Sequence, residues 1–482
     1  MDRFVDIYWP IIVAAIGVVM AVSASLHAAL TKRDVRAAVS WAMVSWFSPY
    51  VGPVLYLLFG INRIQRRATR LKRRRADGPT PHLTESTEAP PGAVAAIQPH
   101  LAPLRRLVDN VTRRNLTRGN RVQPLIGGDA IYDAMLEAVA GAQQTIGIAT
   151  YIFSNDPVGR RLADALGEAV DRGVTVKVLI DGFGARYSRP RIAGYLQERG
   201  IETAHFLESV MPWRMPYANL RNHRKIMVVD GRTGFAGGAN IRASFSRSQV
   251  GEDAQRDIHF RFDGPVVAHL AEAFAEDWAF ITQESLDDEA WFPDLRALDD
   301  GVLARGILSG PDRNMEATHW SLMGALSVAR ERVLVATPYF LPDRQLVAAI
   351  NIAASRGVDI DILLPERNNL RLVSWAATAQ LAQVLRGACR VHLTRPPFDH
   401  SKIVIVDGVW ALVGSSNWDP RSLRLNFEFD VEIYDPVLCE TLGRHLDGLR
   451  QAGREITQSE LAARPPLVRA RDAAVWLFSP YL

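Results

Sequence analysis

The chain has 482 residues, 48% of them hydrophobic, and its 56 basic and 52 acidic residues give a formal net charge of +4. Only two cysteines occur, Cys389 and Cys439, so a disulfide framework is excluded and a reducing compartment is compatible. Eight of the basic residues lie in one run, residues 63–75, and the rest of the chain is mildly acidic. This distribution argues against a general nucleic-acid binder, which would carry its basic patch on the folded domain.

The N-terminal region contains two apolar stretches, 9–30 and 37–59, each long enough to cross a bilayer as a helix. Charged residues separate them, so residues 1–62 predict a transmembrane helical hairpin. The basic run that follows places the later residues in the cytoplasm by the positive-inside rule, together with the N-terminus. A cleaved signal peptide and a pair of buried core helices are weaker alternatives. The first apolar stretch exceeds the usual signal length, and the tryptophans and the basic flank favour a membrane.

Residues 63–104 predict a basic juxtamembrane segment that attracts anionic lipids, followed by a flexible linker. The linker prediction rests on residues 76–104, which are rich in Pro, Thr, Ala and Glu. About 380 residues remain, enough for two lobes with hydrophobic cores. Residues 208–220 gather Met211, Trp213, Met215 and Tyr217. Either core packing or an apolar rim that admits acyl chains explains this cluster.

One pattern occurs twice in the second part of the chain. It reads N-H-R-K-I-M-V-V-D-G-R-T-G-F-A-G-G-A-N at 222–240 and D-H-S-K-I-V-I-V-D-G-V-W-A-L-V-G-S-S-N at 399–417. In each copy an apolar run, an Asp-Gly turn and a second apolar run predict a β-hairpin. Because side chains alternate along a strand, the His and the Lys share one face. The Gly or Ser and the Asn after the returning strand come back beside them.

These two hairpins supply the candidate functional residues. An imidazole, an ammonium and an amide on one surface suit a phosphodiester: Lys and Asn hold its oxygens, and a His attacks phosphorus or moves a proton. Asp230 and Asp407 belong to the repeated pattern and are counted with the catalytic candidates, although an Asp-Gly turn favours a structural role for both. The candidates are His223, Lys225, Asp230, Gly238 and Asn240 in the first copy and His400, Lys402, Asp407, Ser415 and Asn417 in the second.

The repeated pattern resembles the H-x-K-x4-D-x6-G-[SG]-x-N motif of the phospholipase D superfamily, in which two copies meet across a pseudo-twofold axis and form one active site. The resemblance implies an α/β fold with two pseudo-twofold-related lobes, 105–290 and 291–482, each a mixed sheet flanked by helices. Similar strings before each motif support a repeat, 145–153 with 332–340 and 174–181 with 358–365. Gly238 departs from the commoner Ser, which puts a symmetric phosphate clamp in doubt.

The same resemblance implies a carboxylate downstream of each motif that holds an imidazole ring. Glu428, eleven residues after Asn417, fits this role, and Asp257 is the choice in the first half. A carboxylate on Nδ1 leaves Nε2 free to attack. We expect no metal and no cofactor, because this chemistry requires neither. His259 and His319 are interpreted as structural.

Longer strings resemble the bacterial cardiolipin synthases, a family within that superfamily. They include L-L-F-G-I-N-R at 57–63, L-R-N-H-R-K-I-M-V-V-D-G at 220–231 and G-S-S-N-W-D-P-R-S-L-R-L-N-F-E at 414–428. The resemblance implies a multi-pass enzyme of the bacterial inner membrane with cytoplasmic lobes. It would transfer a phosphatidyl group from one phosphatidylglycerol to another through a phosphatidyl-histidine. A membrane-tethered hydrolase of the phospholipase D type and another phosphatidyltransferase remain as alternatives, and the sequence leaves the oligomeric state open.

Overall fold

The computed structural model describes residues 2–32, 35–60, 85–208, 220–311 and 315–479. The basic run at 63–75 and most of the apolar cluster at 208–220 lie outside these residues. The chain divides into two units, one of residues 1–75 with 209–219 and one of residues 76–208 with 220–482.

Among its described residues, the N-terminal unit contains one helix long and apolar enough to cross a membrane. Its apolar part is Tyr8–Thr31, 24 residues within α1. The predicted second span is wrong as a continuous helix: it breaks after 13 residues, at Phe47. Pro49 has no N–H to donate and disfavours a helical conformation at the residue before it, so the helix stops there. The elements are α1 (Asp2–Thr31), α2 (Val35–Phe47), α3 (Val51–Leu55) and η1 (Tyr56–Gly60).

Residues 85–112 are folded, which corrects the predicted linker from residue 85 onward. Val94, Leu101 and Leu104 are fully buried and belong to the same core cluster as Leu322 of the second half. Pro99 and Pro103 stand in the first turns of two of the helices here, where a missing N–H costs nothing. The elements are η2 (Glu85–Thr87), α5 (Ala93–Ile97), η3 (Pro99–Leu101) and α6 (Ala102–Thr112).

The larger unit is built on one sheet of 15 strands within the described residues, in the order β15-β11-β10-β9-β12-β13-β14-β8-β1-β7-β6-β5-β2-β3-β4. Apart from β15 at one edge, this order reads the same from the central β8–β1 pair outward in both directions, with β1 matching β8, β2 matching β9, and so on. The strings that suggested a repeat fall on matching strands, β2 with β9 and β3 with β10. The predicted α/β fold with two related halves is confirmed.

The first half contains β1 (Thr117–Ile126), α7 (Gly128–Gly141), β2 (Thr145–Thr150), α8 (Pro157–Asp171), β3 (Thr175–Asp181), η4 (Gly184–Tyr187), α9 (Ile192–Gln197), β4 (Glu202–Phe206), β5 (Ile226–Val229), β6 (Thr233–Gly237), η6 (Ala243–Phe245), α10 (Arg247–Val250), η7 (Gly251–Asp253), β7 (Ile258–Asp263) and α11 (Val267–Thr282). The second half contains β8 (Val302–Ser309), α12 (Ala317–Val328), β9 (Arg332–Ala336), α13 (Arg344–Ser355), β10 (Asp359–Pro365), α14 (Arg371–Val384), β11 (Arg390–Thr394), β12 (Ile403–Val406), β13 (Trp410–Gly414), α15 (Pro420–Arg424), β14 (Glu428–Tyr434), α16 (Pro436–Ala452), β15 (Arg454–Ile456), α17 (Gln458–Ala463) and α18 (Pro466–Trp476).

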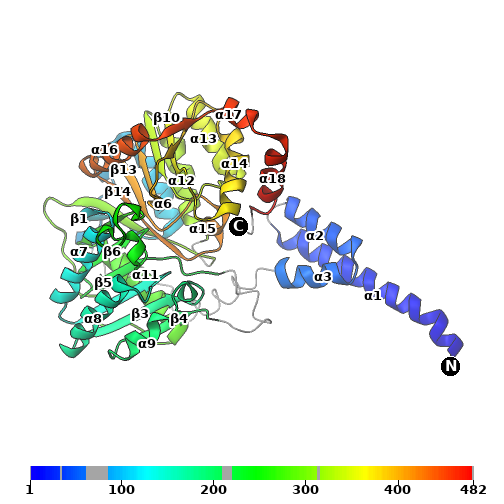
Figure 1. The fold of residues 1–482 in the computed structure, drawn as a ribbon, viewed down its shortest axis with the longest axis horizontal. Helices are drawn as coiled ribbons and strands as arrows, with labels where there is room; N and C mark the ends of the chain where they lie inside the picture. Colours follow the sequence, from blue (N-terminus) through cyan, green and yellow to red (C-terminus); the bar gives the residue numbers. More distant parts are fainter. Residues whose placement is uncertain (1, 33–34, 61–84, 209–219, 312–314, 480–482) are drawn as a thin grey trace. The chain divides into compact units, whose positions relative to one another are not determined.

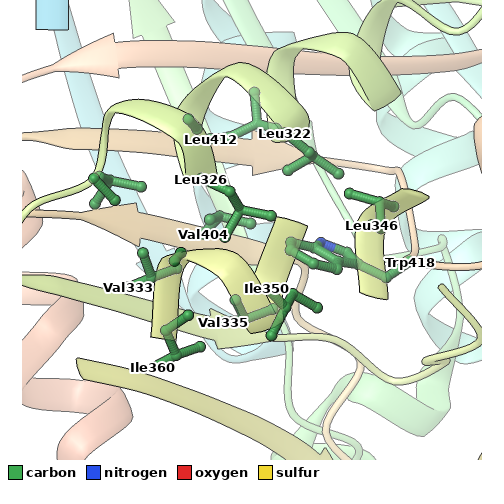
Figure 2. Packing of buried hydrophobic residues seen from close by; sticks show 14 of the residues in the cluster. Leu322, Leu326, Val333, Val335, Leu346, Ile350, Ile360, Val404, Leu412 and Trp418 are labelled. Atoms are coloured by element: carbon green, nitrogen blue, oxygen red, sulfur yellow. The ribbon is translucent and has the colours of Figure 1, made fainter. Parts of the chain in front are cut away.

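Each half has its own core, and a third core joins them. In the second half, Leu322 and Leu326 of α12 and Ile350 of α13 pack on strand side chains (Figure 2). In the first half, α8 and α9 lie beside β3 and β4, and α7 packs against α8 (Figure 1). A shared cluster contains α11 and α16 side chains together with residues of β5, β7, β8 and β14. Each fully buried aliphatic side chain contributes about 1.5–3 kcal/mol, so this cluster binds the two halves into one compact unit.

Candidate active site

The two motifs form matching hairpins, as predicted. β5 and β12 are fully buried apolar strands, and each returns through an Asp-Gly turn. Asp230 and Gly231 have φ values of 52° and 60°, and Asp407 and Gly408 have 51° and 65°. These positive values are what a tight hairpin turn requires.

Backbone pairing between the halves brings the two histidines together. The His223 N–H donates to the Phe427 carbonyl at 2.9 Å, and the His400 N–H donates to the Arg256 carbonyl at 2.8 Å. Phe427 and Arg256 stand immediately before Glu428 and Asp257. Each histidine segment therefore pairs with the carboxylate-bearing segment of the other half, and the two arrangements are equivalent.

The side chains cross between the halves in the same way. His223 Nδ1 lies 2.9 Å from Glu428 Oε2, and His400 Nδ1 lies 3.0 Å from Asp257 Oδ2. The sequence named these two carboxylates but left open which histidine each one holds. In both pairs the carboxylate contacts Nδ1, which leaves Nε2 on the other side of the ring.

Sheet register shows that the two carboxylates are equivalent. Gly237 lies opposite His259 between β6 and β7, and Gly414 lies opposite Asp430 between β13 and β14. Counting back two residues from each partner gives Asp257 and Glu428. The longer insertion in the first half changes the distance along the sequence but not this position.

Both motif lysines are buried beside the histidines. Lys225 Nζ donates to the His223 carbonyl at 2.7 Å, and Lys402 Nζ donates to the His400 carbonyl at 2.5 Å. Burial lowers the pKa of Lys225 to about 7 and that of Lys402 to about 8. The Lys402 ammonium lowers the pKa of Lys225 further, and the carboxyl groups of Asp257 and Glu428 offset part of the effect at both lysines. A bound phosphate anion would stabilise the protonated, positively charged form of both lysines.

Burial also dominates the ionisation of the crossed pairs. It lowers the pKa of His223 and of His400 well below the usual value, and the two lysines add to this effect. It raises the pKa of Glu428 to about 7 and that of Asp257 well above its usual range. When the Nδ1–H of a neutral imidazole donates to the carboxylate, the Nε2 lone pair is free, which is the form needed for attack or for accepting a proton.

Three further candidates are the two motif asparagines and Ser415, and each makes a hydrogen bond near the histidines. Asn240 uses its Oδ1 to accept the Ile152 N–H at 3.2 Å, whereas Asn417 donates to Ser422 at 3.2 Å and its buried Oδ1 has no partner among the described residues. Ser415 donates to Glu428 Oε2 at 2.6 Å.

Gly238, the counterpart of Ser415, explains why the two copies differ. A Cβ at Gly238 would stand 2.6 Å from Asp257 Oδ2 and 2.9 Å from the His400 carbonyl. The first half therefore combines a glycine with the shorter carboxylate, and the second combines a serine with the longer one. The missing hydroxyl is a packing requirement of the Asp257 side chain.

Asp230 and Asp407 are not brought into the site, which corrects their place among the catalytic candidates. Each lies at the far end of its strand from the motif lysine. The Asp230 carboxylate accepts N–H groups from three residues, 143–145, at 2.7–2.9 Å. The Asp407 carboxylate accepts those of residues 330–332 at 2.8–2.9 Å and lies 2.7 Å from His100 Nε2. Both side chains tie a hairpin turn to the start of the neighbouring strand.

Sequence reasoning missed the aromatic rings around the histidines. Tyr151 lies with its ring centroid 5.2 Å from that of His223. Around His400 the rings of Phe245, Phe398 and Tyr339 lie at 5.9–6.3 Å. Tyr151 and Tyr339 belong to the two strings that suggested the repeat, 145–153 and 332–340. The sequence therefore contained a signal for these two rings.

The two histidines interpreted as structural lie outside the crossed pairs. His259 is completely buried, and burial lowers its pKa to about 3, so it is neutral. His319 lies 3.2 Å from an oxygen of Asp343, which also caps α13.

Comparison with known proteins assigns the chain to a family. The model described as "Cardiolipin synthase, PLD-like domain" matches residues 135–278 and 322–450, and the model "Phospholipase D-nuclease N-terminal" matches residues 11–60. The chain belongs to the phospholipase D-like cardiolipin synthase family. It is 33% identical over 463 residues to cardiolipin synthase A of Pseudomonas fluorescens strain SBW25, covering 95% of both chains. It is 34% identical over 416 residues to cardiolipin synthase A of Pseudomonas aeruginosa strain PAO1, covering 86% of this chain and 84% of that one.

A solved structure agrees with the fold of this cardiolipin synthase family member. The crystal structure of phosphatidylserine synthase from Haemophilus influenzae aligns with a TM-score of 0.61 at 16% identity, covering 79% of this chain and all of that one. At this identity the likeness establishes the arrangement of the two halves alone.

Proposed function

We propose that this protein is a membrane-bound cardiolipin synthase that transfers a phosphatidyl group from one phosphatidylglycerol to the terminal hydroxyl of another, releasing glycerol. The observation that carries the proposal is the crossed pair of imidazoles, each held at Nδ1 by a carboxyl group of the other half, with two buried lysines between them. Sequence similarity to a cardiolipin synthase along 95% of the chain supports phosphatidylglycerol as the substrate.

In the first half-reaction His223 Nε2 attacks phosphorus, and the bond between phosphorus and the glycerol oxygen breaks. His400, which enters this step as the imidazolium opposite the bound phosphate anion, gives its Nε2 proton to that oxygen, and glycerol leaves. A phosphatidyl-histidine remains, its oxygens held by Lys225, Lys402 and the amides of the two motif asparagines. We assign attack to His223 from the family resemblance.

In the second half-reaction His400, now neutral, takes the proton of the acceptor hydroxyl. The new phosphorus–oxygen bond forms as the phosphorus–nitrogen bond breaks, which regenerates His223. One phosphodiester replaces another, so the transfer needs no nucleotide. The covalent intermediate divides one difficult substitution into two easier ones.

The membrane supplies the lipid. Most of the exposed large apolar side chains in the described residues lie between Tyr8 and Leu58, a surface that a bilayer would cover. The basic run at 63–75 favours placing the catalytic unit at the cytoplasmic face of the bacterial inner membrane.

Incubation of the purified protein with labelled phosphatidylglycerol tests the proposal. We expect labelled cardiolipin and an equal amount of free glycerol. Phosphatidic acid as the main product would identify a hydrolase instead. A His223→Ala or His400→Ala variant that still forms cardiolipin would contradict the shared site.

A further inference from the structure

Two arginines, Arg221 and Arg421, border the His223 side of the active site and have no arginine at the matching positions of the other motif. Alignment of the two motifs matches Arg221 with Phe398, and Arg421 with Ser244. His223 is therefore bordered by two arginines and Tyr151. His400 is bordered by aromatic rings and by Arg256, whose guanidinium donates to the carbonyls of Arg395 and Pro396. The two sides of the pseudo-twofold site thus differ in the number and placement of their arginines.

The two arginines come from opposite halves and meet at the backbone beside the site. The Phe427 N–H donates to the Arg221 carbonyl at 2.9 Å, and the Asn426 N–H donates to the Arg421 carbonyl at 2.9 Å. Both side chains are half-buried. Both act on the Tyr151 hydroxyl: burial raises its pKa, and each arginine opposes that rise.

Arg221 has no carboxylate at ion-pair distance within the described residues. Its guanidinium donates to the Leu220 carbonyl at 2.7 Å and lies over the Phe183 ring at 4.2 Å. The nearest acidic group that acts on it, Asp181, is occupied by backbone N–H groups of residues 183, 184 and 222 at 2.8–2.9 Å. A half-buried guanidinium with fork-shaped donors suits a phosphate.

Exposed aromatic rings continue this side of the site. Phe183 is 40% exposed and Tyr187 is 53% exposed, and their centroids lie 5.9 Å apart. Tyr187 also lies 6.3 Å from Tyr151. A cation next to exposed rings matches a lipid, whose phosphate is followed by apolar chains.

We propose that Arg221 and Arg421 form a second anion site that binds the phosphate of the acceptor lipid while its hydroxyl attacks at the histidines. This inference rests on the proposed function. Donor and acceptor keep their acyl chains in the same bilayer, so the acceptor must fold back toward the mouth of the site. Its phosphate, three carbons from the reacting oxygen, then lies outside the lysine pair and within reach of the arginines. The site thereby selects an anionic lipid over water or a small alcohol.

A partition experiment tests this inference. Labelled phosphatidylglycerol is supplied with ethanol as a neutral competing acceptor, and the ratio of cardiolipin to phosphatidylethanol is measured. Both products arise from one intermediate, so the ratio is independent of donor binding and of the folded fraction. We expect Arg221→Gln and Arg421→Gln each to lower the ratio about tenfold or more, the loss expected for one charge-assisted hydrogen bond, and Arg221→Lys to lower it less.

The control is Arg161→Gln, an exposed arginine of α8 paired with Asp133, which should leave the ratio unchanged. An unchanged ratio in both active-site variants would overturn the second anion site while leaving the proposed function intact. Absence of cardiolipin with the wild-type protein would instead refute the proposed function.

A separate observation concerns the N-terminal unit, where the chain returns after α2. Tyr50 Oη donates to the Val13 carbonyl at 2.6 Å, midway along α1. Six residues later, Tyr56 Oη lies 2.7 Å from His27 Nδ1, and Lys32 donates to the Gly60 carbonyl. As the chain runs from residue 50 to residue 60, its partners thus advance along α1 from the middle to the end.

The geometry of α2 and α3 agrees with a reversal. At 13 residues α2 is about 20 Å long, short of the roughly 30 Å hydrocarbon core of a bilayer. α2 and α3 both lie along the C-terminal part of α1 (Figure 1). Tyr56 packs on Trp41 at 5.4 Å, and a Cβ at Gly52 would stand 2.3 Å from the Val44 carbonyl, so only glycine allows this close return.

We infer that residues 35–60 form a re-entrant helical pair and that the chain crosses the membrane once, through α1. Residue 60 then leaves the bilayer on the side where α1 ends, and the N-terminus lies on the opposite, periplasmic side. This replaces the expectation of a hairpin with both ends in the cytoplasm. Non-helical backbone at membrane depth is tolerated when protein covers it, and α1 provides that cover.

Thiol labelling tests this topology. Cys389 and Cys439 are buried, so the folded protein offers a low background. In spheroplasts, a membrane-impermeant maleimide should label a cysteine added before Met1 and should label Ala462→Cys, at an exposed position, only after permeabilisation. Equal labelling of both positions before permeabilisation, or protection of both, would overturn the single crossing.

Discussion

Replacement of Asp257 by Asn tests the crossed arrangement of carboxylates and histidines. The substitution keeps the shape of a side chain that is 1% exposed and removes its charge. Its Oδ2 lies 3.0 Å from His400 Nδ1, a contact that fixes the ring and stabilises the imidazolium formed during proton transfer. The loss of one charge-assisted hydrogen bond costs about 1.5–3 kcal/mol. An amide that also turns its NH₂ toward Nδ1 imposes the wrong tautomer, so we expect a rate loss of about 10²–10⁴-fold.

Stability should respond differently from activity. Burial raises the pKa of Asp257 well above its usual range, so a charged carboxylate is costly at this position and a neutral amide should not lower Tm. The assay is the initial rate of cardiolipin formation from labelled phosphatidylglycerol, with thermal unfolding followed by circular dichroism. Asp263→Asn is the matched control, because Asp263 lies at the far end of β7, the strand that begins immediately after Asp257, and accepts a hydrogen bond from Thr233 at 2.8 Å. A folded Asp257→Asn variant within threefold of the wild-type rate would refute the crossed pair.

Three further predictions concern the lysines, the turn aspartates and the glycine of the motif. Lys225→Gln and Lys402→Gln should each lower activity at least about 100-fold without lowering Tm. Their folded pKa values of about 7 and 8 lie below the unfolded value of 10.5, so wild-type stability should rise as pH increases from about 7 to 10.5, and a urea titration of the double variant should show a smaller rise. Asp230→Ala and Asp407→Ala should each reduce the free energy of unfolding by about 2–3 kcal/mol through lost backbone hydrogen bonds, while the rate per folded molecule stays near wild type; a specific loss of rate at full Tm would restore a catalytic role. Gly238→Ser, although it copies the second motif, should lower the rate at least tenfold because its Cβ displaces Asp257, and wild-type turnover would contradict that packing.

The geometry of the candidate active site could be largely predicted because its signal is local. His-x-Lys on a strand, an Asp-Gly turn and a returning Asn fix a hairpin through alternation and turn chemistry, and the duplication pointed to two such hairpins in one site. The prediction that Asp230 and Asp407 have structural roles also followed from the turn. Glu428 and Asp257 were named from the resemblance, without a partner for either.

Local sequence patterns gave wrong predictions for two segments whose structure depends on contacts with distant residues. Residues 85–104 have the composition of a linker, yet Val94, Leu101 and Leu104 find a core more than two hundred residues away in the sequence. The stretch 37–59 is apolar enough to span a membrane, but Pro49 ends its helix and contacts with α1 at Val13 and His27 turn the chain back.

By itself the sequence determined the two hairpins, the paired chemistry they carry and the α/β halves around them, because strand alternation and turn formation depend on neighbouring residues. Only the tertiary structure decided that each carboxylate contacts the histidine of the other half and that the glycine of one motif accommodates a shorter acid. Those outcomes depend on which distant strands pair across the pseudo-twofold axis, and no spacing along the chain encodes that pairing.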